Sequence, residues 1–89
     1  GIVGKNVAII GAGNIGTKIS LLMVERGAKV LLTRNNFYKL KKITETLNSI
    51  KPIYTKEKII AVKKNINAIR TADIIIGATN GQPVISKEM

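Results

Sequence analysis

The pattern of apolar and polar residues along the chain predicts alternating strands and helices. Short apolar runs without polar alternation, as expected for parallel strands covered on both faces, occupy residues 6–10, 29–33, 59–62 and 73–78. Between them, apolar residues recur with the spacing of amphipathic helices over residues 15–26, 37–50 and 65–71. This alternation indicates an α/β fold, a Rossmann-like doubly wound parallel sheet of about four strands.

The apolar residues on each predicted helix mark the face that we expect to pack against the sheet. They are Ile15, Ile19, Leu22 and Met23 in the first helix, Phe37, Leu40, Ile43, Leu47 and Ile50 in the second, and Ile66, Ile69 and Ala72 in the third. Asn35 or Asn36 is placed to cap the second helix, and Pro52 ends it.

A glycine-rich turn joins the first predicted strand to the first helix. It reads Gly11-Ala12-Gly13-Asn14-Ile15-Gly16, a G-x-G-x-x-G in the strand–turn–helix context that dinucleotide-binding sites require. Gly11 allows the tight turn, Gly13 lets the backbone approach a pyrophosphate, and Gly16 lets the helix pack closely. We therefore expect the turn and the start of the helix, Asn14 and Ile15 included, to hold the phosphates of a dinucleotide.

The residues at the end of the second predicted strand indicate which dinucleotide we expect at the glycine-rich turn. NAD sites place an acidic residue there for the ribose 2′-hydroxyl, whereas this chain reads Thr33-Arg34-Asn35-Asn36 and has no carboxylate in the segment. A guanidinium at Arg34 can pair with a 2′-phosphate, and Lys39 and the Thr33 hydroxyl can join the same anion site. The pattern favours NADP over NAD. The alternative is that Arg34 is an ordinary exposed charge.

Composition narrows the choice of function. The 89 residues hold 15 Lys and Arg against 5 Asp and Glu, a net charge of +10, with no cysteine and no histidine. The chain therefore lacks a thiol nucleophile, a disulfide and the commonest metal ligands, and we expect no metal site. A basic surface attracts phosphorylated ligands, but only three aromatic residues are present, so we do not expect nucleic acid. No apolar run is long enough to span a membrane, and we expect a cytoplasmic protein.

Two stretches carry a resemblance to known families. Residues 5–13 together with Thr33-Arg34-Asn35 resemble the NADP-binding domains of shikimate dehydrogenases and glutamyl-tRNA reductases. Residues 72–79 with Pro83-Val84-Ile85 are similar to a segment of glutamyl-tRNA reductases, and more weakly to methylene-tetrahydrofolate and methylene-tetrahydromethanopterin dehydrogenases and to adenosylhomocysteinases. Thr33 replaces the asparagine of the family pattern, Asn35 replaces its threonine, and Tyr38 stands where a basic residue is usual. Adenosylhomocysteinases keep an acid at the position of Arg34.

The resemblance implies an NADP-dependent dehydrogenase or reductase that transfers hydride to or from a small metabolite. It places Ala78, Thr79 and Asn80 beside the nicotinamide ribose, although an ordinary Asn-Gly turn would explain that loop too. It also implies that substrate binding and catalysis come from another domain, and we name no catalytic residue here. The alternative is a non-redox regulatory module that senses nucleotides; such modules usually keep the acid that Arg34 replaces.

The last predicted strand leads to an expectation about completeness. Residues 73–78 are apolar enough for burial, yet residues 84–89 read as the approach to another element. An apolar strand edge without a neighbour invites pairing with another chain. We therefore expect residues 1–89 to be an incomplete dinucleotide-binding domain of a larger polypeptide, whose next strand follows Met89. The alternative is that a partner chain supplies the strand in a homo-oligomer.

Overall fold

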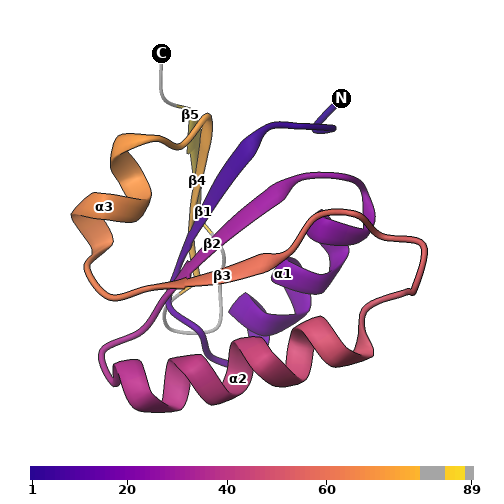
Figure 1. The fold of residues 1–89 in the computed structure, drawn as a ribbon. Helices are drawn as coiled ribbons and strands as arrows, with labels where there is room; N and C mark the ends of the chain where they lie inside the picture. The colour runs from indigo at the N-terminus through magenta and orange to yellow at the C-terminus, as the bar shows by residue number, and fades with distance from the viewer. Residues whose placement is uncertain (79–83, 88–89) are drawn as a thin grey trace.

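A computed structural model describes residues 1–78 and 84–87 of the chain. It shows the predicted order of strands and helices, with one strand more (Figure 1). The elements are β1 (Asn6–Ile10), α1 (Asn14–Glu25), β2 (Lys29–Thr33), α2 (Phe37–Ile50), β3 (Ile59–Val62), α3 (Asn65–Arg70), β4 (Ile74–Gly77) and β5 (Val84–Lys87). The strands and helices predicted up to residue 77 are therefore confirmed: four of the seven have the predicted ends, and the ends of α1, α3 and β4 shift by one residue.

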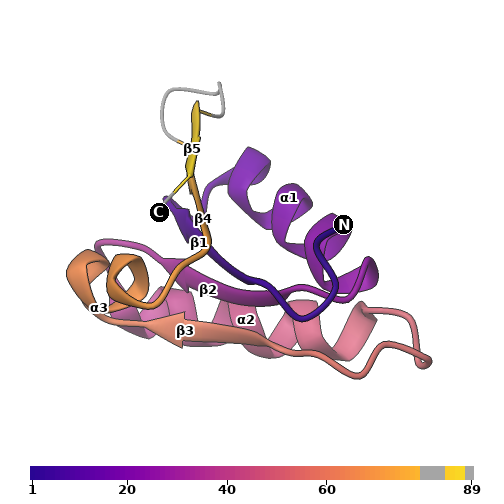
Figure 2. The same ribbon diagram turned by 90° about the horizontal axis from the view of Figure 1, so that it is seen from above.

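The strands form one sheet in the order β3-β2-β1-β4-β5. The first four are parallel, with Ile10 beside Thr33 on one side and beside Gly77 on the other. Helices α1 and α2 lie against one face of the sheet and α3 lies on the other (Figures 1 and 2). This is the predicted α/β, Rossmann-like doubly wound arrangement, in which the carboxyl ends of the parallel strands share one edge.

Strand β5 corrects the expectation about the free edge of β4. Val84–Lys87 pairs antiparallel with β4, placing Ile85 opposite Ile76, so the neighbour comes from this chain and precedes Met89. The segment between Gly77 and Val84 is too short for the crossover of a dozen or more residues that a parallel strand needs. Strand β5 therefore runs antiparallel to β4 and lies at the outer end of the sheet (Figure 2).

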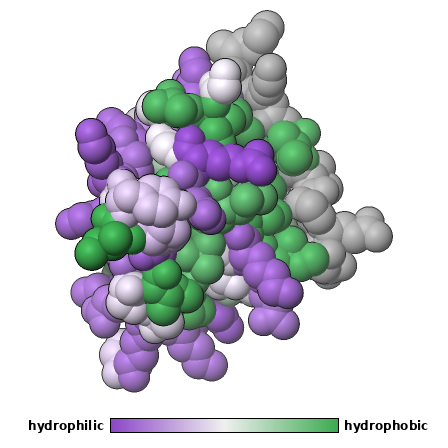
Figure 3. Space-filling model, turned by 90° about the vertical axis from the view of Figure 1, so that its right-hand side faces the viewer, coloured by the Kyte–Doolittle hydropathy of each residue, from purple (hydrophilic) through white to green (hydrophobic). Residues whose placement is uncertain are grey.

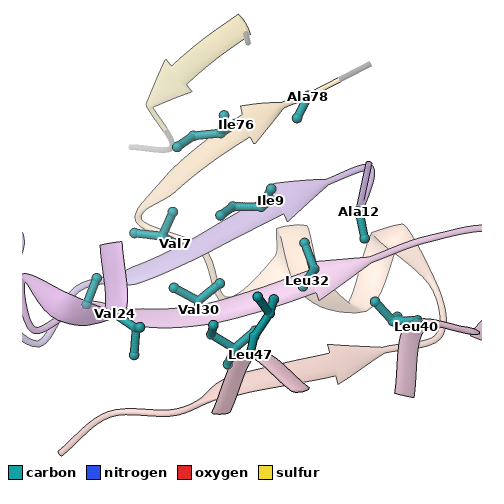
Figure 4. Close-up of a cluster of buried hydrophobic side chains, with 12 residues drawn as sticks. Val7, Ile9, Ala12, Val24, Val30, Leu32, Leu40, Leu47, Ile76 and Ala78 are labelled. Atoms are coloured by element: carbon teal, nitrogen blue, oxygen red, sulfur yellow. The ribbon is translucent and has the colours of Figure 1, made fainter. Parts of the chain in front are cut away.

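The main core fills the space between the sheet and helices α1 and α2 (Figure 4). Its strand residues alternate along each strand, as a sheet packed on one layer of helices requires. Fully buried members include Val7, Ile9, Val30 and Leu32 from the strands, with Val24 and Leu40 from the helices. A smaller cluster around Ala8, Ala68 and Ala72 packs α3 against the opposite face.

Three predicted helix-face residues were placed wrongly. Leu22, Ile50 and Ile66 are 43%, 61% and 56% exposed. In α1 the buried positions are instead Gly16, Ser20 and Val24, because the helix approaches the turn so closely that its small residues face inward. The other predicted residues of α1, Ile15, Ile19 and Met23, are partly buried against the core.

The surface mixes apolar and charged side chains. On the face shown in Figure 3, apolar side chains reach the surface between hydrophilic ones. Among the residues that the structure describes, none of the helices combines the length and the apolar character that crossing a membrane would take.

Candidate dinucleotide-binding site

The glycine-rich turn lies at the carboxyl edge of the sheet, between β1 and α1. Gly11 has a φ of 107°, a left-handed conformation that only glycine adopts without strain. Its amide donates a hydrogen bond of 3.1 Å to the carbonyl oxygen of Thr33. The turn is thereby tied to the end of β2, which brings the two sequence motifs together.

Gly16 and Gly13 have different reasons to be glycine. A Cβ added at Gly16 would overlap the carbonyl oxygen of Gly11 and lie 3.6 Å from the Cβ of Ala78. At Gly16 the helix therefore packs directly on the backbone of the turn. The sequence predicted that Gly16 lets the helix pack closely on the sheet, and the observed contact lies nearer to the motif than that. A Cβ added at Gly13 would meet nothing within 4 Å, and Gly13 has an ordinary φ of −87°. Nothing in the free protein requires glycine at that position.

Helix α1 points its amino end at this open space. Its N-cap is Gly13, which has no side chain to accept a hydrogen bond from the first amides, and its first turn carries no acidic residue. The first amides of a helix lack partners within the helix and carry its positive dipole end. The turn can therefore donate hydrogen bonds to an anion without displacing a side-chain cap.

A pocket of about 540 Å³ opens at this edge, between the turn, the end of β2 and the starts of α2 and α3. It brings together most of the predicted site residues: Gly11, Gly13, Thr33, Arg34, Asn35, Lys39 and Ala78. Asn14 is exposed beside it, Ile15 packs against the core and Gly16 is buried, so none of these three lines the pocket. Thr79 and Asn80 lie outside the described residues.

The wall formed by β2 and α2 is positively charged. One guanidinium nitrogen of Arg34, Nη1, donates a hydrogen bond of 3.2 Å to the carbonyl oxygen of Ala12, which holds the side chain across the pocket toward the turn. Lys39 lines the same wall. Asn36 caps α2 by accepting a 3.1 Å hydrogen bond from the amide of Lys39. No acidic residue is among the described residues that line the pocket.

The hydroxyl of Thr33 is unusual in this wall. Thr33 is 1% exposed, and its Oγ1 is buried without a hydrogen-bond partner in the described part of the chain. A buried polar atom without a partner costs stability, about 1–3 kcal/mol. Such a group at a pocket marks hydrogen-bonding capacity that the free protein leaves unused.

Four lining residues were absent from the sequence prediction: Ile10, Ala12, Asn36 and Asn65. The first three adjoin predicted residues in the chain, so a wider window around each motif would have found them. Asn65 comes from the start of α3 and carried no sequence signal, because its place at the pocket depends on β3 lying beside β2.

The acidic residue Asp73 lies at the edge of the sheet opposite the glycine-rich turn, beside the start of β1. Its carboxylate accepts a 2.8 Å hydrogen bond from the amide of Asn6, and its own amide donates one of 2.7 Å to the carbonyl oxygen of Asn6. Asp73 thus joins the start of β4 to the start of β1. This is a structural task, and it leaves the pocket without a carboxylate from Asp73.

Comparison with known proteins agrees with this geometry. A family model described as "NADP oxidoreductase coenzyme F420-dependent" matches residues 6–86. The chain belongs to this family. The match includes the glycine-rich turn, Arg34, strands β1 to β4 and the first three residues of β5.

The chain is also similar to glutamyl-tRNA reductases. It is 29% identical to the enzyme of Thermosipho melanesiensis over 98% of its own length. It is 32% identical to that of Methanocaldococcus jannaschii and 33% to that of Methanococcus maripaludis, in each case over 99% of its length. It spans only 21% to 22% of those relatives, so the likeness is to one part of a larger enzyme. The predicted resemblance to glutamyl-tRNA reductases is confirmed.

Proposed function

We propose that this chain is the NADP(H)-binding domain of a larger reductase. The observation that carries the proposal is the pocket between the glycine-rich turn and the positively charged wall of Arg34 and Lys39. A 2′-phosphate is the group that distinguishes NADP from NAD, and it calls for an arginine or lysine where NAD sites place an acid.

The residues present fit the cofactor. The open space at Gly13 and the uncapped start of α1 suit a pyrophosphate. Arg34 and Lys39, with Asn35 beside them, would hold the 2′-phosphate. Ala78, Thr79 and Asn80 would lie toward the nicotinamide ribose, on the β4 side of the turn.

NADPH supplies a hydride when it is bound, and the residues of this chain bind and orient it. The proposal assigns the substrate and the proton-transfer groups to another domain of the full protein, as the relatives' greater length suggests. The sequence prediction was hydride transfer to or from a small metabolite. The relatives are named as reductases of glutamyl-tRNA, so this substrate is the first to test with the full-length protein.

Titration of the protein with NADPH and with NADH, followed by calorimetry or by nicotinamide fluorescence, tests the proposal. We expect NADPH to bind at least about tenfold more tightly, because a charge-assisted hydrogen bond contributes about 1.5–3 kcal/mol and about 1.4 kcal/mol is tenfold in affinity. Equal dissociation constants would refute the preference for NADP. Failure of both to bind would refute the assignment as a dinucleotide site.

A further inference from the structure

We propose that Asn65 recognises the 6-amino group and a neighbouring ring nitrogen of the cofactor's adenine, and so selects the base. This inference rests on the proposed NADP(H) function and extends it to a residue that no sequence motif indicated. Asn65 lines the same pocket as the glycine-rich turn and Arg34.

The order of the strands determines which part of the cofactor reaches Asn65. The turn after β1 is the phosphate site, and Arg34 at the end of β2 is the site for the 2′ position of the ribose. The next strand outward is β3, and α3 begins at Asn65 after it. A dinucleotide that runs from β1 past β2 therefore directs its base toward β3 and the start of α3.

The side chain of Asn65 makes no hydrogen bond to the residues that the structure describes. It is exposed, and α3 has Lys64 as its N-cap and no side-chain cap hydrogen bond, so the amide is not needed to start the helix. An asparagine amide offers a donor next to an acceptor. Adenine offers the complementary pair, its 6-amino donor next to the ring acceptor N1 or N7, and paired hydrogen bonds of this type discriminate between bases.

A second observation points to a ligand in this pocket, which Thr33 also lines. Thr33, on β2 between the turn and β3, has a hydroxyl that is buried without a partner in the described residues. The pocket lining thus includes a buried hydroxyl, at Thr33, and an exposed amide, at Asn65, for which the described residues provide no hydrogen-bond partner. Both groups lie in the pocket that we propose holds the dinucleotide.

Two cofactors and two matched variants test the proposal. The cofactors are NADPH and the analogue in which hydrogen replaces the 6-amino group of adenine, so that a hydrogen-bond donor is removed and nothing is added. The variants are Asn65→Ala and Asn67→Ala, which make the same change on one helix. Asn67 is exposed as well but does not line the pocket.

We expect the wild-type protein and Asn67→Ala to bind NADPH several-fold more tightly than the analogue. Asn65→Ala should bind NADPH about tenfold more weakly than wild type and should not distinguish the two cofactors. Asn65→Leu, which keeps the size of the side chain without its hydrogen bonds, should behave like Asn65→Ala. Thermal unfolding of each variant shows whether the domain is still folded, as expected for changes at an exposed position.

The outcomes separate this inference from the proposed function. If wild type binds neither cofactor, the proposed function fails. If wild type binds NADPH but Asn65→Ala keeps its affinity, or keeps the preference over the analogue, the role of Asn65 is refuted while the NADP(H) site stands.

Discussion

Two glycines of one turn, Gly16 and Gly13, differ in whether the fold itself requires a glycine at their position. At Gly16 any side chain would collide with the backbone of Gly11. At Gly13 a side chain has open space and an ordinary backbone conformation in the free protein. Packing in the fold therefore explains the glycine at position 16, whereas the glycine at position 13 is the one that we propose lies against the pyrophosphate. Four substitutions test this difference between the two sides of the turn and the pocket beside it.

Gly16→Val should have the largest effect, and the effect should be on folding. Glycine is a poor helix former, about 1 kcal/mol worse than alanine inside a helix, so replacing it does not by itself destabilise α1. A loss of stability in this variant would therefore come from the collision with the turn. Overpacking costs about 1–3 kcal/mol, and contact with a backbone oxygen cannot be relieved by a rotamer change. We expect about 3 kcal/mol or more of lost stability in urea unfolding. A variant as stable as wild type would mean that α1 does not pack on the turn as described.

Gly13→Val should leave the fold largely intact and abolish dinucleotide binding. The expected cost in stability is that of a poorer helix N-cap, about 1 kcal/mol. The expected loss of NADPH affinity is at least about a hundredfold, because the side chain would fill the space assigned to the pyrophosphate. Calorimetry measures the affinity, and circular dichroism checks the fold. Full affinity in this variant would contradict the phosphate site.

Arg34→Ala should lower the affinity for NADPH by about tenfold or more and leave the affinity for NADH nearly unchanged. The reason is the lost charge-assisted pair with the 2′-phosphate. Arg70→Ala is the matched control, since Arg70 is exposed on α3 and does not line the pocket. An equal loss for both cofactors would show instead that Arg34 supports the turn through its hydrogen bond to Ala12.

Thr33→Val should have the smallest effect. We expect it to raise the stability of the free protein and to lower its affinity for NADPH. The change removes a buried hydroxyl that has no partner in the described structure, so we expect the free protein to gain about 1 kcal/mol. If a ligand uses this hydroxyl, NADPH affinity should fall a few-fold. Thermal unfolding and titration on the same samples measure both. Unchanged affinity would show that Thr33 takes no part in binding.

The strands, the helices and the central residues of the site could be predicted because the sequence patterns that indicate them are local. The apolar run of β1, the glycine spacing and the helical periodicity of α1 all lie within a short window, and parallel strands buried on both faces have few other arrangements. Arg34 could be placed in the same way, since the residue after β2 faces the turn in this topology. The pocket accordingly contains seven of the twelve predicted site residues.

Residues with longer-range roles could not be predicted from the sequence. Leu22 fits the apolar face of α1 as well as Val24 does, but only the close contact of Gly16 with the turn rotates the helix so that Val24 is buried and Leu22 exposed. Likewise, Asn65 becomes a pocket residue only because β3 lies next to β2.

The alternation of elements, the glycine-rich turn and the replacement of the usual acid by Arg34 could thus all be recognised in the sequence. Contacts between distant segments set the antiparallel return of β5 beside β4, the helix residues that face the core, and the shared pocket of Asn65 and Thr33. The physical reason is that periodicity and turn chemistry act between neighbours in the chain, whereas strand order and helix rotation are set by packing between distant segments.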